Sequence, residues 1–335
     1  MPLASLALLF AVVLFSASQQ DPVIDAAPPF DEWRQELIAE ARARGYSEAL
    51  IQQALAGVRP LPRVIQNDRS QAELVVGFDR YYRSRVAPPI VRRGRELARQ
   101  HGAVLTRIEG AYSVPRRFLV AIWGMETRYG RVTGNTPVFR ALATLAWEPR
   151  RAAFFRGELF DALTMVSRGD IDTASMTGSW AGAMGQPQFM PSSYLKFAED
   201  FDRDGRRDIW RSTPDALASI ANYLQAWGWD DEFTWGREVQ VTADTRARID
   251  EEVPKRIDGC FAMRNMTERI PLTDWQRLGV RRVNGRALPQ RSVPAGLVTT
   301  DSRTFLVYEN YDAILRYNCA HYYALTVALL ADQIR

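Results

Sequence analysis

The chain has 335 residues, of which 47% are hydrophobic and 24% charged, a composition typical of a folded protein with a large buried core. Its formal net charge of +4 comes from scattered basic residues, without the dense basic stripe of a nucleic-acid-binding protein, so we expect no nucleic-acid partner. Two histidines and two cysteines argue against a multi-histidine zinc site and a Ser-His-Asp triad. Carboxylates are therefore the candidates for catalysis.

The N-terminus carries an unbroken stretch of apolar and small residues at positions 3–17. This stretch is too short to span a membrane easily, and the small and polar residues after it predict a signal peptide cleaved near Ser18. No Lys or Arg precedes the stretch, which keeps a short N-terminal anchor as the alternative. No cysteine ends it, so we expect an exported, periplasmic protein that is not a lipoprotein.

Apolar residues at helical spacing dominate most of the chain. Gly45 and Gly57 are predicted helix stops, Pro88 and Pro89 a divider between two helices, and Ser113 an N-cap. The predicted helices, in chain order, lie at 31–57, 74–82, 90–101, 114–130, 152–168, 192–199, 215–227 and 323–334.

After residue 235 the pattern changes to turn-rich segments with short apolar runs. Residues 239–241 and 305–308 are predicted strands. The sequence therefore predicts a mostly α-helical α+β protein with a small β-rich segment before its last helix. The expected parts are a signal peptide at 1–18, an N-terminal helical region at 19–110, a core at 111–238, and a β-rich segment with the C-terminal helix at 239–335.

Glu126 stands near the end of an otherwise apolar helix, flanked by Trp123, Met125 and Tyr129. Apolar neighbours disfavour the charged form of a carboxyl group, which can then serve as a general acid. A glycosidic bond needs such a group because its leaving oxygen must be protonated. The alternative is a solvated glutamate or one paired with Arg128.

The segment 178–194 combines many small residues with polar and aromatic ones. Small residues let a ligand or another backbone approach closely. Ser179 and Gln188 offer hydrogen bonds, while Phe189 and Tyr194 offer apolar faces, a mixture suited to sugars. The segment is thus predicted to line a groove, with a glycine-rich turn over an aromatic core as the alternative.

The runs 123–130 and 178–194 resemble motifs of the lytic murein transglycosylases of the MltB type. Further runs at 141–146, 200–205, 220–224 and 316–318, and then Tyr323-Ala324, match the same family in order. The resemblance covers about residues 30–335. It implies that residues 111–238 form a lysozyme-like catalytic core, completed by the segment 239–335.

The resemblance also implies roles for individual residues. Glu126 would be the only catalytic acid/base. Arg150 and Arg151 match the family's Pro-Arg-Arg step, and we expect them near the peptide or lactyl carboxylates of the substrate. Six further side chains would line the glycan groove: Ser179, Gln188, Tyr223, Tyr317, Asn318 and Tyr323.

A site with one carboxylate differs from ordinary glycosidases, which use two. The resemblance implies that the N-acetylmuramyl acetamide attacks its own anomeric carbon while Glu126 protonates the leaving oxygen. Glu126 would then take the proton of the C6 hydroxyl, which closes a 1,6-anhydro ring. No cofactor is expected for this chemistry.

Residues 200–208 carry alternating aspartates before a glycine, as at the opening of an EF-hand calcium loop. The twelfth position is Arg211, where such a loop has a glutamate. The resemblance implies a modified loop that a later carboxylate closes. We expect a structural Ca²⁺ held by Asp200, Asp202, Asp204, Asp215 and the Arg206 carbonyl, and the alternative is an acidic turn neutralised by its arginines.

The remaining expectations concern the cysteines, the partners and the rival functions. Cys260 and Cys319 either form a disulfide or lie as two separate buried thiols. The expected partner is the glycan strand of peptidoglycan, with complexes of cell-wall synthesis as a further candidate, and we expect a monomer. The rival functions are a lysozyme-like hydrolase, a non-catalytic peptidoglycan-binding scaffold and a calcium sensor.

Overall fold

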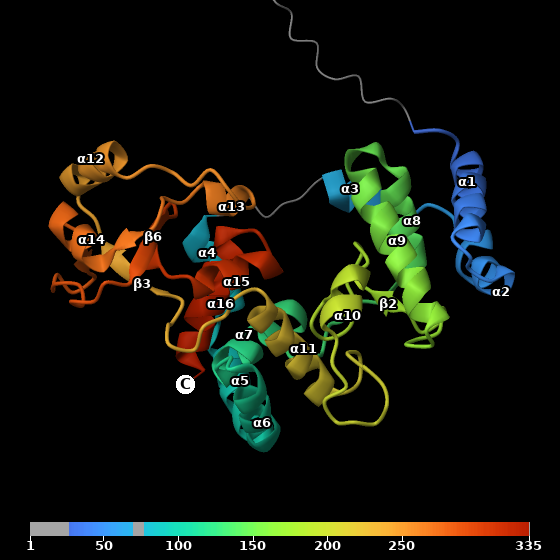
Figure 1. Cartoon of the computed structure of the whole chain (residues 1–335), viewed down its shortest axis with the longest axis horizontal. Helices are drawn as coiled ribbons and strands as arrows, with labels where there is room; N and C mark the ends of the chain where they lie inside the picture. The colour runs from blue at the N-terminus through green and yellow to red at the C-terminus, as the bar shows by residue number, and fades with distance from the viewer. Residues whose placement is uncertain (1–26, 70–76, 335) are drawn as a thin grey trace, which may run out of the picture.

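The computed structural model of the protein describes residues 27–69 and 77–334. The predicted signal peptide at 1–18 and the first residues of the predicted helix at 74–82 lie outside these residues. Within the described part of the chain, no helix is both long and apolar enough to cross a membrane. The elements fall into three groups along the long axis of Figure 1: a sheet with helices, a central set of helices, and an outer set of helices.

The outer set joins the N-terminal helices to two helices from the middle of the chain (Figure 1). Its apolar core includes Leu37, Ile51 and Phe155, which are at most 2% exposed. The elements are α1 (Phe30–Ala43), α2 (Glu48–Ile51), a π-helical turn (Gln52–Ala56), α3 (Pro62–Arg69), α8 (Val138–Trp147), a 3₁₀ turn (Pro149–Arg151) and α9 (Ala152–Ser167).

The central set is built around α7 (Arg116–Thr127), which is buried on nearly all sides from Phe118 to Met125. A helix that is apolar all round is stable only inside a protein, and α7 accordingly packs against α5, α11 and α16. The other elements of this set are α4 (Phe78–Arg85), α5 (Pro88–Gln100), α6 (Gly102–Tyr112), α11 (Thr213–Ala226), α15 (Asn310–Tyr317) and α16 (His321–Gln333), with α10 (Pro191–Phe197) between the central and outer sets (Figure 1).

The third group is an antiparallel five-stranded sheet, in the order β4-β6-β7-β3-β5. Its apolar core includes Trp275, which is fully buried. The elements are β3 (Gly236–Gln240), α12 (Ala243–Glu252), α13 (Phe261–Arg264), β4 (Ile270–Pro271), α14 (Leu272–Leu278), β5 (Arg281–Arg282), β6 (Pro294–Thr299) and β7 (Thr304–Val307). A separate small ribbon pairs β1 (Thr136–Pro137) with β2 (Thr177–Gly178).

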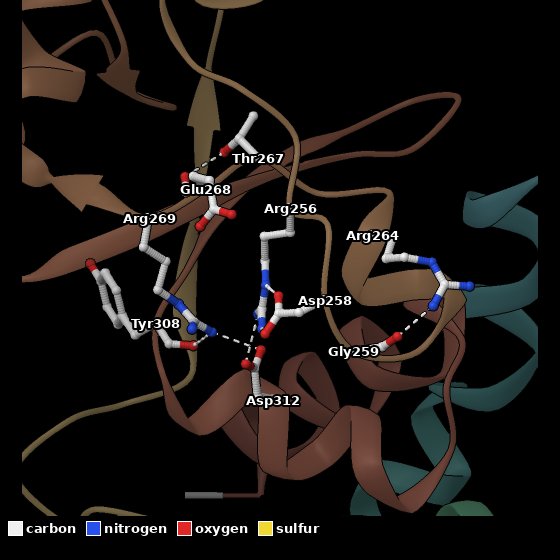
Figure 2. A network of polar contacts seen from close by, with 9 residues as sticks. All are labelled: Arg256, Asp258, Gly259, Arg264, Thr267, Glu268, Arg269, Tyr308 and Asp312. Atoms are coloured by element: carbon white, nitrogen blue, oxygen red, sulfur yellow. Dashed lines mark hydrogen bonds and ion pairs between the residues drawn. The ribbon is translucent and has the colours of Figure 1, made fainter.

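Two ties fasten the sheet group to the central helices. Figure 2 shows Asp312 of α15 between two arginines, Arg256 at 2.8 Å and Arg269 at 2.7 Å. Cys260 and Cys319 form a disulfide with a Cα–Cα distance of 6.3 Å, which decides between the two alternatives left by the sequence. Asp312 lies in the first turn of α15 and Cys319 just beyond its last residue, so the two ties hold both ends of the helix that carries Tyr317.

The structure confirms the mostly helical α+β class and corrects three local predictions. Ser113 is not an N-cap: it ends α6 with a left-handed φ of 54°, and α7 begins at Arg116 after Pro115. The expected division between two helices is present, between Arg85 and Pro88, but Pro88 itself opens α5, because a proline at the first helical position loses no hydrogen bond. The described segment 239–334 holds α12, α13, α14 and α15 besides its strands and its last helix, and β3 begins before it, at Gly236.

Candidate active site

Glu126 lies on the last turn of α7 and is half-buried. The hydroxyl of Tyr323, on the first turn of α16, donates a short hydrogen bond to its Oε1. Burial, and then the negative charge of Glu126, raise the pKa of Tyr323 well above its usual value, so the hydroxyl stays protonated and remains a donor. Two helices from distant parts of the chain therefore meet at one carboxylate.

Tyr317 forms the next wall of the same site, at the C-terminal end of α15. Its hydroxyl donates to the carbonyl of Pro187 at 2.6 Å, and burial followed by the charge of Glu126 raises its pKa well above the usual value. Its ring packs against Tyr223 at 4.8 Å and Phe189 at 5.9 Å between centroids. Tyr223 in turn donates to the carbonyl of Arg316 at 2.5 Å. These contacts form a continuous aromatic wall beside Glu126.

The glycine-rich segment 178–194 forms a compact loop that is held largely by its own backbone and side-chain contacts. A Cβ at Gly178 would lie 2.1 Å from the carbonyl oxygen of Ala183, so this glycine makes room for the segment's own backbone. The Ser179 Oγ accepts the backbone N–H of Ala181 at 3.3 Å and of Ala183 at 3.1 Å. Gln188 donates to the Thr133 carbonyl at 3.0 Å and to the Gly185 carbonyl at 2.9 Å. Both predicted groove residues thus also hold the loop in shape.

The sequence reasoning missed two residues that fix the end of α7 against this loop. Thr127, directly after Glu126, is fully buried and donates to the backbone carbonyl of Gln186 at 2.9 Å. The Gln186 side chain accepts the indole N–H of Trp123 at 2.9 Å. Buried polar groups of this kind need partners, and a threonine next to a lone glutamate is the signal that could have drawn attention to them.

The turn after Glu126 has an unusual backbone. Arg128, Tyr129 and Gly130 have φ angles of 50°, 63° and 77°, and non-glycine residues adopt this left-handed region only where the surroundings hold them there. The ring of Tyr129 provides that support: a Cβ at Gly124 would lie 2.6 Å from it, and its hydroxyl donates to the Ile90 carbonyl at 2.9 Å. The turn is therefore locked between α5 and α7.

Not every predicted site residue joins this cluster through a described contact. Asn318 follows Tyr317 and is exposed. Arg150 and Arg151 instead bind Asp68 of α3: Arg150 donates to Asp68 Oδ2 at 2.8 Å, and Arg151 makes a shorter contact with Oδ1. Burial acts to raise the pKa of Asp68, but the hydrogen bonds from these arginines outweigh it, so the pKa is lowered. The carboxylate of Asp68 thus partly neutralises the charges of Arg150 and Arg151.

The acidic loop lies between α10 and α11. Oxygens of Asp200, Asp202 and Asp204 come within 4.8 Å of one another. Asp215 is fully buried beneath them, and its carboxylate accepts the backbone N–H groups of Phe201 at 2.8 Å, Asp202 at 3.3 Å and Asp208 at 2.9 Å. Three clustered carboxylates suit a hard cation such as Ca²⁺, whereas the oxygens of Asp215 are occupied by the loop backbone.

Comparison with known proteins places this geometry in context. Residues 29–332 match the family model described as the transglycosylase SLT domain. The chain is 34% identical over 261 residues to the membrane-bound lytic murein transglycosylase B of Escherichia coli, an alignment that covers 76% of this chain and 66% of that protein's length. The chain therefore spans slightly less than two thirds of this relative.

Two solved structures extend the comparison. SltB3 from Pseudomonas aeruginosa, in complex with NAG-anhNAM-pentapeptide, is similar with a TM-score of 0.81 and 41% identity, covering 91% of this chain and 79% of that one. The Escherichia coli lytic transglycosylase Slt35, in complex with calcium, is similar with a TM-score of 0.75 and 30% identity, covering 90% of this chain and 92% of that one. Both similarities extend over nearly the whole described chain.

Proposed function

Because the chain belongs to the transglycosylase SLT domain family, we propose that it is a lytic transglycosylase that cleaves the β-1,4 bond between N-acetylmuramic acid and N-acetylglucosamine in peptidoglycan. The observation that carries this proposal is the hydrogen bond from Tyr323 to Glu126, which joins residues 197 positions apart in the sequence. It supports one carboxylate, held by a tyrosine hydroxyl at the end of a buried helix, as the acid/base. The aromatic wall of Tyr317 and Tyr223 provides faces on which sugar rings can pack.

The proposed reaction has two steps. Glu126 first gives its proton to the glycosidic oxygen as the C1–O bond breaks, and the carbonyl oxygen of the muramyl acetamide bonds to C1. The resulting Glu126 carboxylate then takes the proton of the C6 hydroxyl, whose oxygen attacks C1 and displaces the acetamide oxygen. Glu126 ends protonated, the product carries a 1,6-anhydro ring, and no water is consumed. Proximity favours this hydroxyl over solvent, since the attack is intramolecular.

Tyr323 has a positioning role in this scheme. Its hydroxyl binds Oε1 of Glu126 and so fixes the direction in which the carboxyl group faces the sugar when it exchanges the proton. Tyr317 orients the groove rather than the proton, because its own hydroxyl is committed to the Pro187 carbonyl at 2.6 Å. Ser179, Gln188 and Asn318 complete the proposed groove lining. Arg150 and Arg151 are proposed to contact substrate only through the donors that Asp68 leaves available.

A calcium ion is proposed at the acidic loop, with a structural role. Asp200, Asp202 and Asp204 would hold it together with the carbonyl of Arg206. Ligation by Asp215 would require its carboxylate to give up one of the three backbone N–H groups that it accepts. A bound divalent cation there would neutralise the loop's carboxylates, while the residues of the acid/base site are those around Glu126.

We further propose that the protein acts outside the cytoplasm as a monomer. The substrate is the wall polymer, and an exported enzyme would meet it in the periplasm. The disulfide between Cys260 and Cys319 supports this location, because disulfides persist in oxidising compartments. Complexes of cell-wall synthesis are candidate partners.

The proposal is tested by mass spectrometry of the products released from purified peptidoglycan. Muropeptides that end in 1,6-anhydro-N-acetylmuramic acid are expected with the native protein and not with Glu126→Gln. Products heavier by one water would instead identify a hydrolase with a second carboxylate. Binding without any release would favour a non-catalytic scaffold.

A further inference from the structure

The segment 318–320 is the short connection between α15 and α16. A tyrosine of the acid/base site lies on either side of it: Tyr317 ends α15, and Tyr323 lies on the first turn of α16. The connection is extended, with a φ of −148° at Asn318. Its geometry therefore sets the direction in which α16 presents Tyr323 to Glu126.

The backbone of this connection is held mainly by local hydrogen bonds. Asn318 donates its N–H to the Ile314 carbonyl at 3.3 Å, and Ala320 donates to the Asn318 carbonyl at 2.8 Å. Both bonds lie within α15 and the connection itself, so they do not tie it to another element. Among the residues that the structure describes, no side chain caps the N-terminal end of α16, although such caps commonly fix the point where a helix begins.

Cys319 ties the connection to a different part of the protein. Its disulfide partner is Cys260, the residue directly before α13, at a Cα–Cα distance of 6.3 Å. The sulfur of Cys319 also accepts the backbone N–H of Ala262 at 3.3 Å. Both contacts reach the first turn of α13, so this helix fixes the position of Cys319.

The α13 helix is a firm anchor for this purpose. Met263 is 1% exposed and Met266 is fully buried, both in the apolar core that contains α7. Arg256, which precedes α13, binds Asp312 of α15 at 2.8 Å (Figure 2). The disulfide thus holds the connection between α15 and α16 against an element that is itself fixed.

A second, non-covalent tie joins the two helices beside the connection. The hydroxyl of Tyr311 on α15 and Nδ1 of His321 on α16 are 3.0 Å apart, and their rings stack with centroids 6.0 Å apart. Burial lowers the pKa of His321 to about 4, so its ring is neutral at pH 7. Because this tie does not depend on the disulfide, loss of the disulfide should loosen the first turn of α16 rather than release it.

The disulfide is open to solvent. Cys319 is exposed and Cys260 partly exposed, and Phe261, directly after Cys260, is 69% exposed. Exposed disulfides are the ones that thiols reduce more easily. A dithiol that reaches this site would supply two electrons and two protons, the S–S bond would break to give two thiols, and the dithiol itself would become a disulfide.

We propose that the disulfide between Cys260 and Cys319 positions Tyr323 against Glu126, and that its reduction by a dithiol lowers the activity reversibly. The catalytic consequence rests on the proposed function, and the inference adds to it a dependence of activity on the oxidation state of the protein. In the reduced protein the contact of His321 would remain, but the hydroxyl of Tyr323 would meet Glu126 in only part of the molecules.

The experiment compares the oxidised protein, the protein reduced with dithiothreitol, and the double variant Cys260→Ser/Cys319→Ser. The control is Ile249→Ala, which removes fully buried atoms from the apolar core of the sheet group and lowers stability without touching the connection. The parameters kcat and KM on peptidoglycan strands are measured against pH, at a temperature at which circular dichroism shows all forms to be folded. Hydrogen exchange of the backbone amides of residues 317–327 is followed in parallel by mass spectrometry.

Reduction and the double variant should each lower kcat by about 3–10-fold and change KM less, since the alignment of the acid/base is what is lost. The alkaline limb of the kcat profile should move to higher pH, because a donated hydrogen bond favours the charged form of a carboxyl group. Reoxidation should restore the native values, and dithiothreitol should not change the double variant. Ile249→Ala should keep the native kcat and pH profile.

Unchanged kcat and pH profile after reduction that thiol titration shows to be complete would overturn the inference, and so would an equal loss of kcat in Ile249→Ala. Faster hydrogen exchange confined to residues 317–327 after reduction would support it. If the oxidised protein cleaves no strand, the proposed function fails. Unchanged hydrogen exchange in residues 317–327 would then overturn the positioning role by itself.

Discussion

Glu126 and the acidic loop at 200–215 hold carboxylates in two contrasting ways. Glu126 stands at the end of an apolar helix and receives the hydroxyl of Tyr323. In the loop, Asp200, Asp204 and Asp215 accept backbone N–H groups of their own segment. A carboxylate held by one side chain on rigid helices can change its proton without unfolding anything. Carboxylates that organise a loop backbone contribute to structure, and their loss should affect stability first.

The largest expected effect concerns the first of these carboxylates. Glu126→Gln keeps the shape of the side chain but removes its proton transfer, so the rate of product release should fall by about 10²–10⁴-fold. The free energy of unfolding should change little. Activity assays and urea denaturation measure the two effects, with the exposed Glu36→Gln as a control that should alter neither.

A second variant tests whether the hydroxyl on α16 positions Glu126. Tyr323→Phe removes one hydrogen bond to a charged group, a contribution of about 1.5–3 kcal/mol, so kcat should fall by about 10–100-fold. The matched control is Tyr322→Phe on the same helix, whose hydroxyl donates to Asp301 at 3.0 Å. An equal loss of kcat in both variants would show that the effect comes from damage to α16.

In the acidic loop, removal of a carboxylate should lower the free energy of unfolding rather than the activity. Asp215→Ala leaves three backbone N–H groups of the loop without their acceptor, which should lower the free energy of unfolding by about 1–3 kcal/mol. The activity of the remaining folded protein should persist. Asp204→Ala, which removes the acceptor of only the Arg206 N–H at 2.8 Å, should cost less; a larger cost than that of Asp215→Ala would contradict this ranking.

These variants also separate what the sequence could predict from what it could not. The apolar helix that carries Glu126 and the closing helix with Tyr323 follow from local periodicity. Their contact across 197 positions does not, because it depends on how the helices pack, and only the resemblance to a family brought the two together. The pairing of Arg150 with Asp68, 82 positions away, was missed for the same reason.

Local sequence patterns also gave wrong predictions where one residue type is suited to two structural roles. Ser113 before Pro115 fits an N-cap, yet the chain uses it to leave α6 in the left-handed region. The α6 helix itself was not predicted, since the expected helices end at residue 101 and begin again at residue 114. Cys260 and Cys319 lie 59 residues apart in sequence. Their pairing could be predicted only from the way the sheet group packs against α15.

A third carboxylate, that of Asp68, should make the free energy of unfolding depend on pH. The pKa of Asp68 lies below its ordinary value of 3.8 because the hydrogen bonds from Arg150 and Arg151 outweigh the effect of burial. The stabilisation is thus present above the unfolded-state pKa and is lost as pH falls through the lower folded-state pKa. Asp68→Asn should destabilise by about 1 kcal/mol at pH 7, given the half-exposed arginines. The difference from the native protein should shrink below about pH 4; a constant difference would contradict the ion pairs.

The smallest expected effect is that of calcium. Addition of Ca²⁺ should raise Tm by a few degrees or less, since about 1 kcal/mol shifts Tm by about 2–4 °C in a protein of this size. The same addition should leave kcat unchanged. Asp200→Asn/Asp202→Asn should abolish the shift in Tm, as followed by differential scanning calorimetry. A dependence of kcat on Ca²⁺ would remove the distinction between the two carboxylate centres.

The most direct test of the central claim, that Glu126 moves a proton within the substrate and adds no water, is cleavage of peptidoglycan in water enriched in ¹⁸O. The account predicts 1,6-anhydro products that contain no ¹⁸O at the muramyl C1, because the C6 oxygen of the sugar itself attacks that carbon. Incorporation of one ¹⁸O at a new reducing end would contradict the account and identify the protein as a hydrolase.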